Sequence, residues 1–99
     1  MINAKFEAGR GDFMTFVFRE IQKEDYTSCA DSLIAAYANE PWNNPWTLEE
    51  ALLRIEATMS GFNARGYVIE YEGHIIAMCL GRIDYYFQNW RQFCIDEFN

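Results

Sequence analysis

The 99-residue chain carries 51% hydrophobic and 17% aromatic residues, which is enough apolar side chain for one packed core and excludes a largely disordered chain. Eight basic residues against 15 acidic ones give a formal net charge of −7, which argues against a nucleic-acid surface, because phosphate binding needs clustered lysine and arginine. A cationic partner fits this charge better, although an acidic balance more often serves solubility alone.

Cys29, Cys79 and Cys94 stand far apart in the sequence and form no Cys-x-x-Cys pair. Their odd number excludes a complete disulfide framework, and one histidine with scattered cysteines falls short of a set of metal ligands. No signal-peptide pattern opens the chain, and no apolar stretch approaches the roughly 20 residues of a membrane span. We therefore expect a reduced, cytoplasmic protein without a metal or a membrane partner.

The first third of the chain predicts a leader, a strand and a helix. Residues 1–14 contain two glycines, mixed charge and no clear period, so we expect a loose leader there. Residues 15–22 alternate and are rich in the residues that strands favour. Asp25 is a good N-cap for a helix over residues 26–38, whose apolar side chains recur at helical spacing.

The segment NEPWNNPW, residues 39–46, separates this helix from a second one. Its two prolines cannot continue a helix, and its central asparagines favour turns. Thr47 and Glu50 have the spacing of a capping box, which predicts that the second helix begins here. Gly61 is placed to end this helix as a left-handed residue.

The remaining residues predict three strands joined by short turns. Residues 65–72 alternate, Gly73 provides a tight turn, and residues 74–87 form a longer strand in which Gly81 indicates a bulge or a close backbone approach. Residues 91–99, RQFCIDEFN, form the closing strand. The order β-α-α-β-β-β predicts an α+β fold whose last strands form an antiparallel meander.

Four stretches carry a resemblance to a known family: FREIQKEDY at the first strand–helix junction, EPWN between the helices, YEGHIIAMCLGRID across the second hairpin and FCIDEF in the closing strand. Their order resembles the N-terminal half of the GNAT acetyltransferase fold. The Pro-Trp linker and the IDEF strand look most like aminoglycoside 6′-N-acetyltransferases and their relatives. The resemblance covers residues 15–99 and implies a partial domain that ends after the fourth strand, with the C-terminal half absent.

The resemblance also implies acetyl-CoA as the cofactor of the complete fold. In the family, the fourth strand leads into a loop of the form Gln/Arg-x-x-Gly-x-Gly/Ala, which opens a helix and holds the pyrophosphate through backbone N–H groups. This chain stops before such a loop. We therefore expect an acceptor-side half in which only Phe98 and Asn99 reach the cofactor, without tight binding or turnover.

Acetyl transfer to an amine needs a base that takes the ammonium proton, and Asp96 and Glu97 in the closing strand are the candidates. Strand alternation places them on opposite faces, so only one should reach the cleft. The resemblance favours Asp96, because related enzymes carry a functional acid at the matching place. Glu97 would share its face with Phe93 and Ile95, which we expect to pack on a helix.

Two alternatives to this assignment stay open. A bulge in the closing strand would swap its two faces, because a shift of one residue reverses the side on which every side chain lies. Both carboxylates could also be structural, one solvated on an edge and the other paired with Arg82 or Arg91.

The inter-helix linker offers Glu40, Trp42 and Trp46 as acceptor-binding residues, since this linker overhangs the acceptor site in the family. An acidic, aromatic cleft suits a small amine such as a polyamine or an amino sugar, through charge and cation–π contact. The alternative is a tryptophan pair that closes one end of the core. Asp84 and Tyr85 could line the same cleft, or could belong to a strand with one buried face.

Two functions remain in competition at this level. The first is an acetyltransferase half that binds a small amine, and the second is a non-catalytic dimerisation or ligand-binding module derived from the same fold. The apolar closing strand lacks a neighbour, which predicts a homodimer or strand exchange through the exposed fourth strand.

Overall fold

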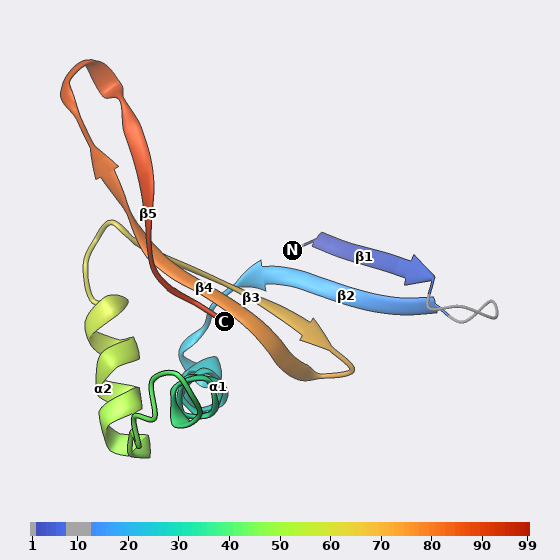
Figure 1. Cartoon of the computed structure of the whole chain (residues 1–99). Helices are drawn as coiled ribbons and strands as arrows, with labels where there is room; N and C mark the ends of the chain where they lie inside the picture. The colour runs from blue at the N-terminus through green and yellow to red at the C-terminus, as the bar shows by residue number, and fades with distance from the viewer. Residues whose placement is uncertain (1, 8–12) are drawn as a thin grey trace.

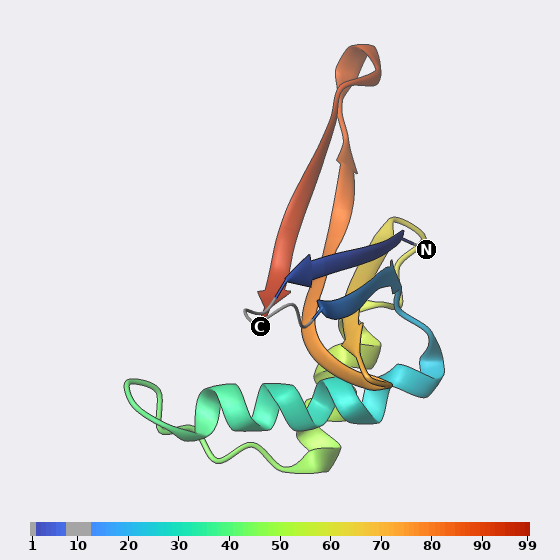
Figure 2. The same ribbon diagram turned by 90° about the vertical axis from the view of Figure 1, so that its right-hand side faces the viewer.

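The computed structural model describes residues 2–7 and 13–99 of the chain. In chain order the elements are β1 (Ile2–Glu7), β2 (Phe13–Glu20), the short 3₁₀ helix η1 (Lys23–Asp25), α1 (Tyr26–Ala38), α2 (Leu48–Thr58), β3 (Ala64–Tyr71), β4 (His74–Tyr85), a second 3₁₀ turn η2 (Phe87–Asn89) and β5 (Arg91–Phe98). The strands form one antiparallel sheet in the order β1-β2-β3-β4-β5. Both helices lie on one side of this sheet, so the predicted α+β fold with its antiparallel meander is confirmed (Figures 1 and 2).

The N-terminal strand β1 differs from the sequence prediction. It pairs with β2 along its whole length, from Ile2 opposite Phe18 to Glu7 opposite Phe13. The loose leader expected over residues 1–14 is therefore wrong for residues 2–7 and 13–14, while residues 1 and 8–12 lie outside the described residues. The sequence of this six-residue segment does not by itself predict a strand. It becomes one because it pairs with β2, and strand formation depends more on such context than on intrinsic propensity.

The two helices begin in different ways. At α2 the predicted capping box is present, with the Glu50 N–H donating to Thr47 Oγ1 at 3.1 Å and the Thr47 N–H donating to Glu50 Oε1 at 3.0 Å. This helix ends at Thr58 with Met59 as its C-cap, which is earlier than the predicted stop at Gly61. Neither helix is long and apolar enough among the described residues to cross a membrane.

Asp25 precedes α1 but does not cap it through its side chain. Its carboxylate instead accepts two hydrogen bonds from the Arg19 guanidinium, at 2.6 and 2.7 Å, and one from the Gln22 N–H at 2.7 Å. Arg19 also bonds Glu70 on β3. The cluster therefore ties the end of β2 to β3 and to the start of α1.

The core lies between the helices and the sheet. Its buried side chains come from both helices and from the sheet: Cys29, Ala30 and Leu33 on α1, Ala51 and Ile55 on α2, and Val68, Met78 and Leu80 on the sheet. Burying a large aliphatic side chain contributes about 1.5–3 kcal/mol relative to leaving it in water. Among the described residues, the opposite face of the sheet carries no helix, and we call it the open face (Figures 1 and 2).

A β-bulge interrupts the pairing of β4 with β5. Leu80 lies opposite Glu97 and Gly81 lies opposite Ile95, so Asp96 is an extra residue without a partner on β4. A Cβ on Gly81 would lie 2.1 Å from the Cys94 carbonyl oxygen, so the close backbone approach predicted at this glycine is confirmed. Beyond the bulge, residues 83–93 continue past the end of β3 and project as a two-stranded arm (Figure 1).

Candidate functional site

The bulge brings Asp96 and Glu97 to the same side of the sheet. Glu97 is only 7% exposed and bonds side chains of α1 and α2, and Asp96 lines a hollow together with Arg54 of α2. The prediction that the two carboxylates lie on opposite faces is therefore wrong. The physical reason is the extra residue, because alternation is lost where two residues of one strand oppose a single residue of the other.

The apolar side chains of β5 point the other way. Phe93 packs edge-on against Tyr67, Phe98 lines a groove on the open face, and Ile95 is 58% exposed. The expectation that Phe93 and Ile95 pack on a helix beside Glu97 is wrong, and so is the grouping of Asp96 with Phe98. The helix side of β5 is its polar side.

Glu97 is held by one residue from each helix. The Tyr37 hydroxyl, in the last turn of α1, donates to Oε2 at 3.2 Å, and Arg54 Nε of α2 donates to Oε1 at 3.2 Å. A buried carboxylate needs such partners, because an unpaired charge in the protein interior is costly. Burial, followed by the neighbouring Glu97 charge, raises the pKa of Tyr37 above its ordinary value.

The aromatic linker packs on Tyr37, whose hydroxyl bonds the Glu97 carboxylate. The Tyr37 ring meets Trp42 edge-on at a centroid distance of 5.4 Å and lies tilted against Trp46 at 6.2 Å. The Asn44 N–H donates to the Tyr37 carbonyl at 2.7 Å, which folds the linker back onto the end of α1. Glu40 is exposed on the same linker. The structure thus brings Trp42, Trp46 and Glu97 together, as one assembly around Tyr37.

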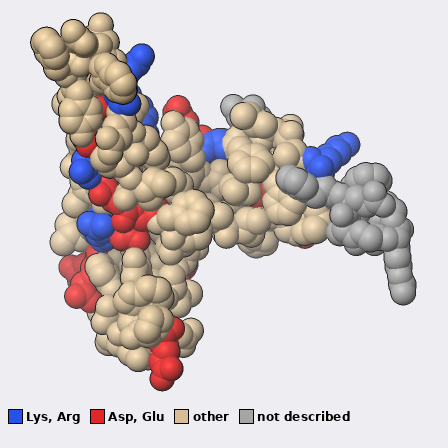
Figure 3. Space-filling model, turned by 45° about the horizontal axis from the view of Figure 1, so that its top comes forward, with Lys and Arg blue, Asp and Glu red and all other residues tan. Residues whose placement is uncertain are grey.

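Asp96 belongs to a second, more exposed group at the base of the arm. Arg82 donates to Asp96 Oδ1 at 2.9 Å and to Asp84 Oδ1 at 3.2 Å, so the alternative of a pairing with Arg82 is what the structure shows for Asp96. The two carboxylates, Asp84 first, raise the pKa of Arg82. Acidic and basic side chains gather next to one another below the arm (Figure 3).

Arg54 links the two groups. A hollow of about 360 Å³ lies between the end of α2 and the bulge, and Arg54, Arg82 and Asp96 line it together with small polar residues. Arg54 lines this hollow while its Nε bonds Glu97. The polar side chains therefore form one continuous track from the linker to the base of the arm.

The other predicted site residues lie elsewhere. Asp84 accepts from Arg82 and from the Cys94 thiol, and Tyr85 is exposed on the arm and stacks on Phe62 at 6.4 Å, so neither meets the linker. Phe98 is 74% exposed on the open face. Asn99 pairs with Met78 through its backbone, and its buried side-chain nitrogen has no partner among the described residues.

Sequence reasoning missed Tyr37 and Arg54 as site residues. Tyr37 fits the apolar stripe of its helix, and only its place in the last turn before the Pro-Trp linker could have indicated a second role. Arg54 gives no local signal, because its partner Glu97 is 43 residues away. Among the described residues, no group of three or more His, Cys, Asp or Glu side chains could hold a metal ion.

Comparison with known proteins identifies the fold and nothing finer. No protein-family model and no curated protein matches the sequence. Among solved structures, a possible acetyltransferase from Clostridium difficile 630 superposes with a TM-score of 0.68 at 13% identity. The fold is acetyltransferase-like. The superposition covers 84% of this chain and 55% of the neighbour, so the chain spans about half the length of that protein.

Proposed function

We propose that this chain is the acceptor-side half of an acetyl-CoA-dependent N-acetyltransferase that acts on a small amine in the cytoplasm. The fold supports the transferase class, and the observation that carries the proposal is the assembly of Trp42, Trp46 and Tyr37 over the buried Glu97. Aromatic faces and carboxylates together attract an ammonium group through cation–π contact and charge. Polyamines and aminoglycoside-like amino sugars are the amines to test.

Within this proposal, Asp96 acts as the base and Glu97 positions the linker. Both oxygens of Glu97 already accept bonds, from Arg54 and Tyr37, whereas among the described residues only Oδ1 of Asp96 is bonded, to Arg82. The free oxygen of Asp96 can accept a proton from an ammonium group that enters the hollow. The amine then has the lone pair that attack on a thioester carbonyl requires.

Phe98, which we expected to reach the cofactor, points to the open face, away from Asp96 and Glu97. An anion such as pyrophosphate is usually held by backbone N–H groups at a helix start. We therefore propose that acetyl-CoA belongs to the complete family fold and that this chain alone does not turn it over. A thiol-release assay with a panel of amines tests this, and robust turnover by the 99-residue chain would contradict it.

Amine binding tests the acceptor site directly. Isothermal titration of the chain with an aminoglycoside and with a linear polyamine should show saturable binding that weakens with added salt. Trp46→Ala should weaken binding about two- to fivefold, as expected for one cation–π contact. Asp96→Asn should weaken it as well.

The matched control is Asp31→Asn, which removes one negative charge from an exposed position on α1. It should leave the affinity unchanged, and circular dichroism checks that each variant is folded. An affinity that falls equally for Asp31→Asn and Asp96→Asn would show attraction by net charge alone. No binding at all would favour the second candidate, a non-catalytic dimerisation or ligand-binding module, which the uncovered apolar open face supports.

A further inference from the structure

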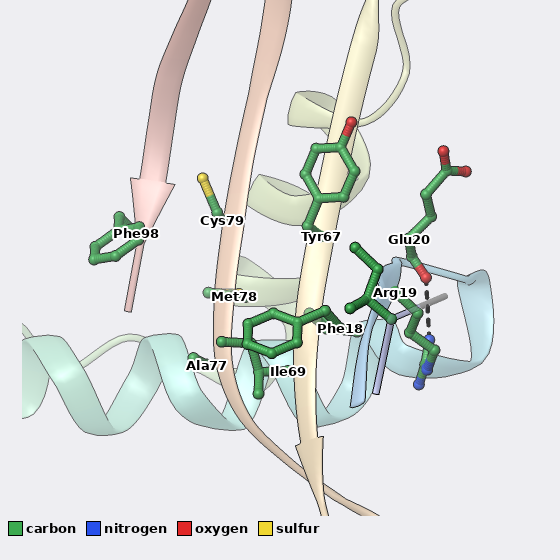
Figure 4. A pocket seen from close by; sticks show the side chains of 11 residues that line it. Phe18, Arg19, Glu20, Tyr67, Ile69, Ala77, Met78, Cys79 and Phe98 are labelled. Atoms are coloured by element: carbon green, nitrogen blue, oxygen red, sulfur yellow. Dashed lines mark hydrogen bonds between the residues drawn. The ribbon is translucent and has the colours of Figure 1, made fainter. Parts of the chain in front are cut away.

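An apolar groove lies on the open face of the sheet. Its volume is about 450 Å³, and residues of all five strands line it, among them Ile2, Phe18, Tyr67, Ile69, Cys79 and Phe98 (Figure 4). Glu20 stands at its rim and is exposed. The neighbouring Arg19 guanidinium is engaged by Asp25 and Glu70, so it does not neutralise the rim.

The tip of the arm is a protrusion that carries exposed aromatic rings. Tyr85, Tyr86, Phe87 and Trp90 gather there and are 53%, 55%, 87% and 71% exposed. Gln88, with a φ of 62°, has a left-handed backbone that turns the chain between these rings. The arm projects away from the helices (Figure 1), and its rings are exposed to solvent.

The exposed aromatic area is large for a chain of this size. Seven rings take part, on the open face and along the arm: Tyr67, Tyr85, Tyr86, Phe87, Trp90, Phe93 and Phe98. With about 150–250 Å² for a whole aromatic side chain, their exposed fractions amount to roughly 800 Å². This area is divided between the tip of the arm and the open face, and exposed aromatic surface of this kind commonly marks an interaction site. One partner of a standard interface buries about 800 Å².

We propose that two copies of this chain pair through their open faces about a two-fold axis, with the arm tip of each copy seated in the groove of the other. A protruding aromatic tip and an apolar groove on one chain satisfy each other reciprocally in such a pair. Phe93 and Ile95, on the open face between tip and groove, would meet their counterparts near the axis. This pairing does not depend on the proposed transfer chemistry.

Charge favours a second copy over a membrane as the occupant of this surface. The chain has a net charge of −7, which opposes approach to an anionic bilayer and to a second copy alike, so the choice depends on local charges of opposite sign. Arg91 is exposed beside the arm tip and Glu20 is exposed at the groove rim, and neither side chain is ion-paired among the described residues. Seating the tip would place Arg91 near Glu20 of the other copy.

Sedimentation equilibrium tests the proposal with the whole chain. The wild type should form dimers at micromolar concentration, and Trp90→Ala and Phe87→Ala should each weaken dimerisation at least about tenfold, as expected for central aromatic anchors. Both side chains are mostly exposed, so these variants should fold, which circular dichroism checks. The matched control is Leu53→Ala on α2, which removes a side chain that is 65% exposed and should leave the dimer intact.

A charge reversal then tests how the copies are oriented. Arg91→Glu and Glu20→Arg should each weaken the dimer, and the double variant should restore it, because the pair is rebuilt with its signs exchanged. A wild type that stays monomeric at high micromolar concentration would overturn the proposal. So would a dimer that the arm variants leave unchanged, or anionic vesicles that bind the arm while the chain remains monomeric.

Discussion

The Cys94 thiol donates a hydrogen bond to Asp84, with Sγ 2.9 Å from Oδ2. This bond, followed by burial and the Asp84 charge, raises the pKa of Cys94. Asp84→Asn should lower that pKa, and the thiol should then react faster with iodoacetamide at pH 8, since the thiolate is the nucleophile. Mass spectrometry of the modified peptide measures the rate.

The control for this prediction is Asp31→Asn, which is remote from the thiol and should leave the Cys94 rate unchanged. Cys29 provides an internal standard, because burial raises its pKa to about 11 and should keep it the slowest thiol in every variant. An Asp84→Asn chain whose Cys94 reacts no faster would show that the hydrogen bond does not control the thiol.

The Asp25 carboxylate leads to a prediction about how the free energy of unfolding depends on pH. The hydrogen bonds from Arg19 lower its pKa below the ordinary value, so its stabilising effect is complete above about pH 4 and is lost as the pH falls through the lowered pKa. Asp25→Asn should therefore reduce the free energy of unfolding at pH 7 by about 1.5–3 kcal/mol, the range for hydrogen bonds to a charged group. Urea denaturation at pH 7 and at pH 2.5 measures the difference.

At pH 2.5 the wild type and Asp25→Asn should be closer in stability than at pH 7, because below the ordinary carboxyl pKa the unfolded chain takes up a proton at Asp25, which the folded state with its lowered pKa binds less readily. Asp31→Asn, an exposed change on the same helix, should stay near the wild type at both values. An equal loss for Asp25→Asn at both pH values would mean that the charge of Asp25 is not what stabilises the fold.

Some residues of the candidate site could be predicted from the sequence, and others could not. Trp42 and Trp46 were chosen from their residue types and the family resemblance, and the structure places both against Tyr37, while their role in an acceptor cleft stays a prediction. Tyr37 and Arg54 could not, because their roles arise from contacts with Glu97 on a strand that lies far along the chain. Asp84 and Tyr85 were placed wrongly beside the linker, since nothing local shows that the arm turns away from it.

At the scale of elements, the bulge in β5 decides which side chains form the site. Gly81 permits it, because any side chain there would collide with the Cys94 carbonyl. Gly81→Ala should reduce the free energy of unfolding by at least about 2 kcal/mol, as for a forced contact in a packed region, and should separate β4 from β5. Urea denaturation measures the loss, and hydrogen exchange of the β5 amides locates it.

Gly73→Ala is the control for the bulge. No heavy atom lies within 4 Å of a Cβ at Gly73, so the change costs only the strain of its φ of +79°, about 1 kcal/mol. It should leave exchange in β5 unchanged. A Gly81→Ala chain as stable as Gly73→Ala would show that the bulge relaxes without difficulty.

The elements themselves were largely predictable where the signal is local. The capping box at Thr47 and the close approach at Gly81 depend on single residues with few conformational options, and both were read from the sequence. The strand β1 and the faces of β5 were not, because one depends on its pairing with β2 and the other on an insertion of one residue in the ladder. Alternation predicts faces only while the pairing register is regular.

At the scale of the whole molecule, the two sides of the sheet have different chemistry. The helix side carries the core, the aromatic linker and the polar track, and the open face with the arm carries exposed aromatic surface. The helix side supports the proposed acceptor site, and the open face supports the proposed dimer. The likeness to a possible acetyltransferase covers the fold that positions both.

The three tryptophans allow one measurement to test the proposed acceptor site. Trp42 and Trp46 lie around Tyr37 at the linker, and Trp90 lies at the tip of the arm. Nuclear magnetic resonance of the ¹⁵N-labelled chain resolves their indole N–H signals, which single Trp→Phe variants assign. During titration with an aminoglycoside or a linear polyamine, the Trp42 and Trp46 signals should shift saturably while the Trp90 signal stays in place. A shift of Trp90 alone, equal shifts of all three signals, or no shift at saturating amine would contradict an acceptor site at the linker.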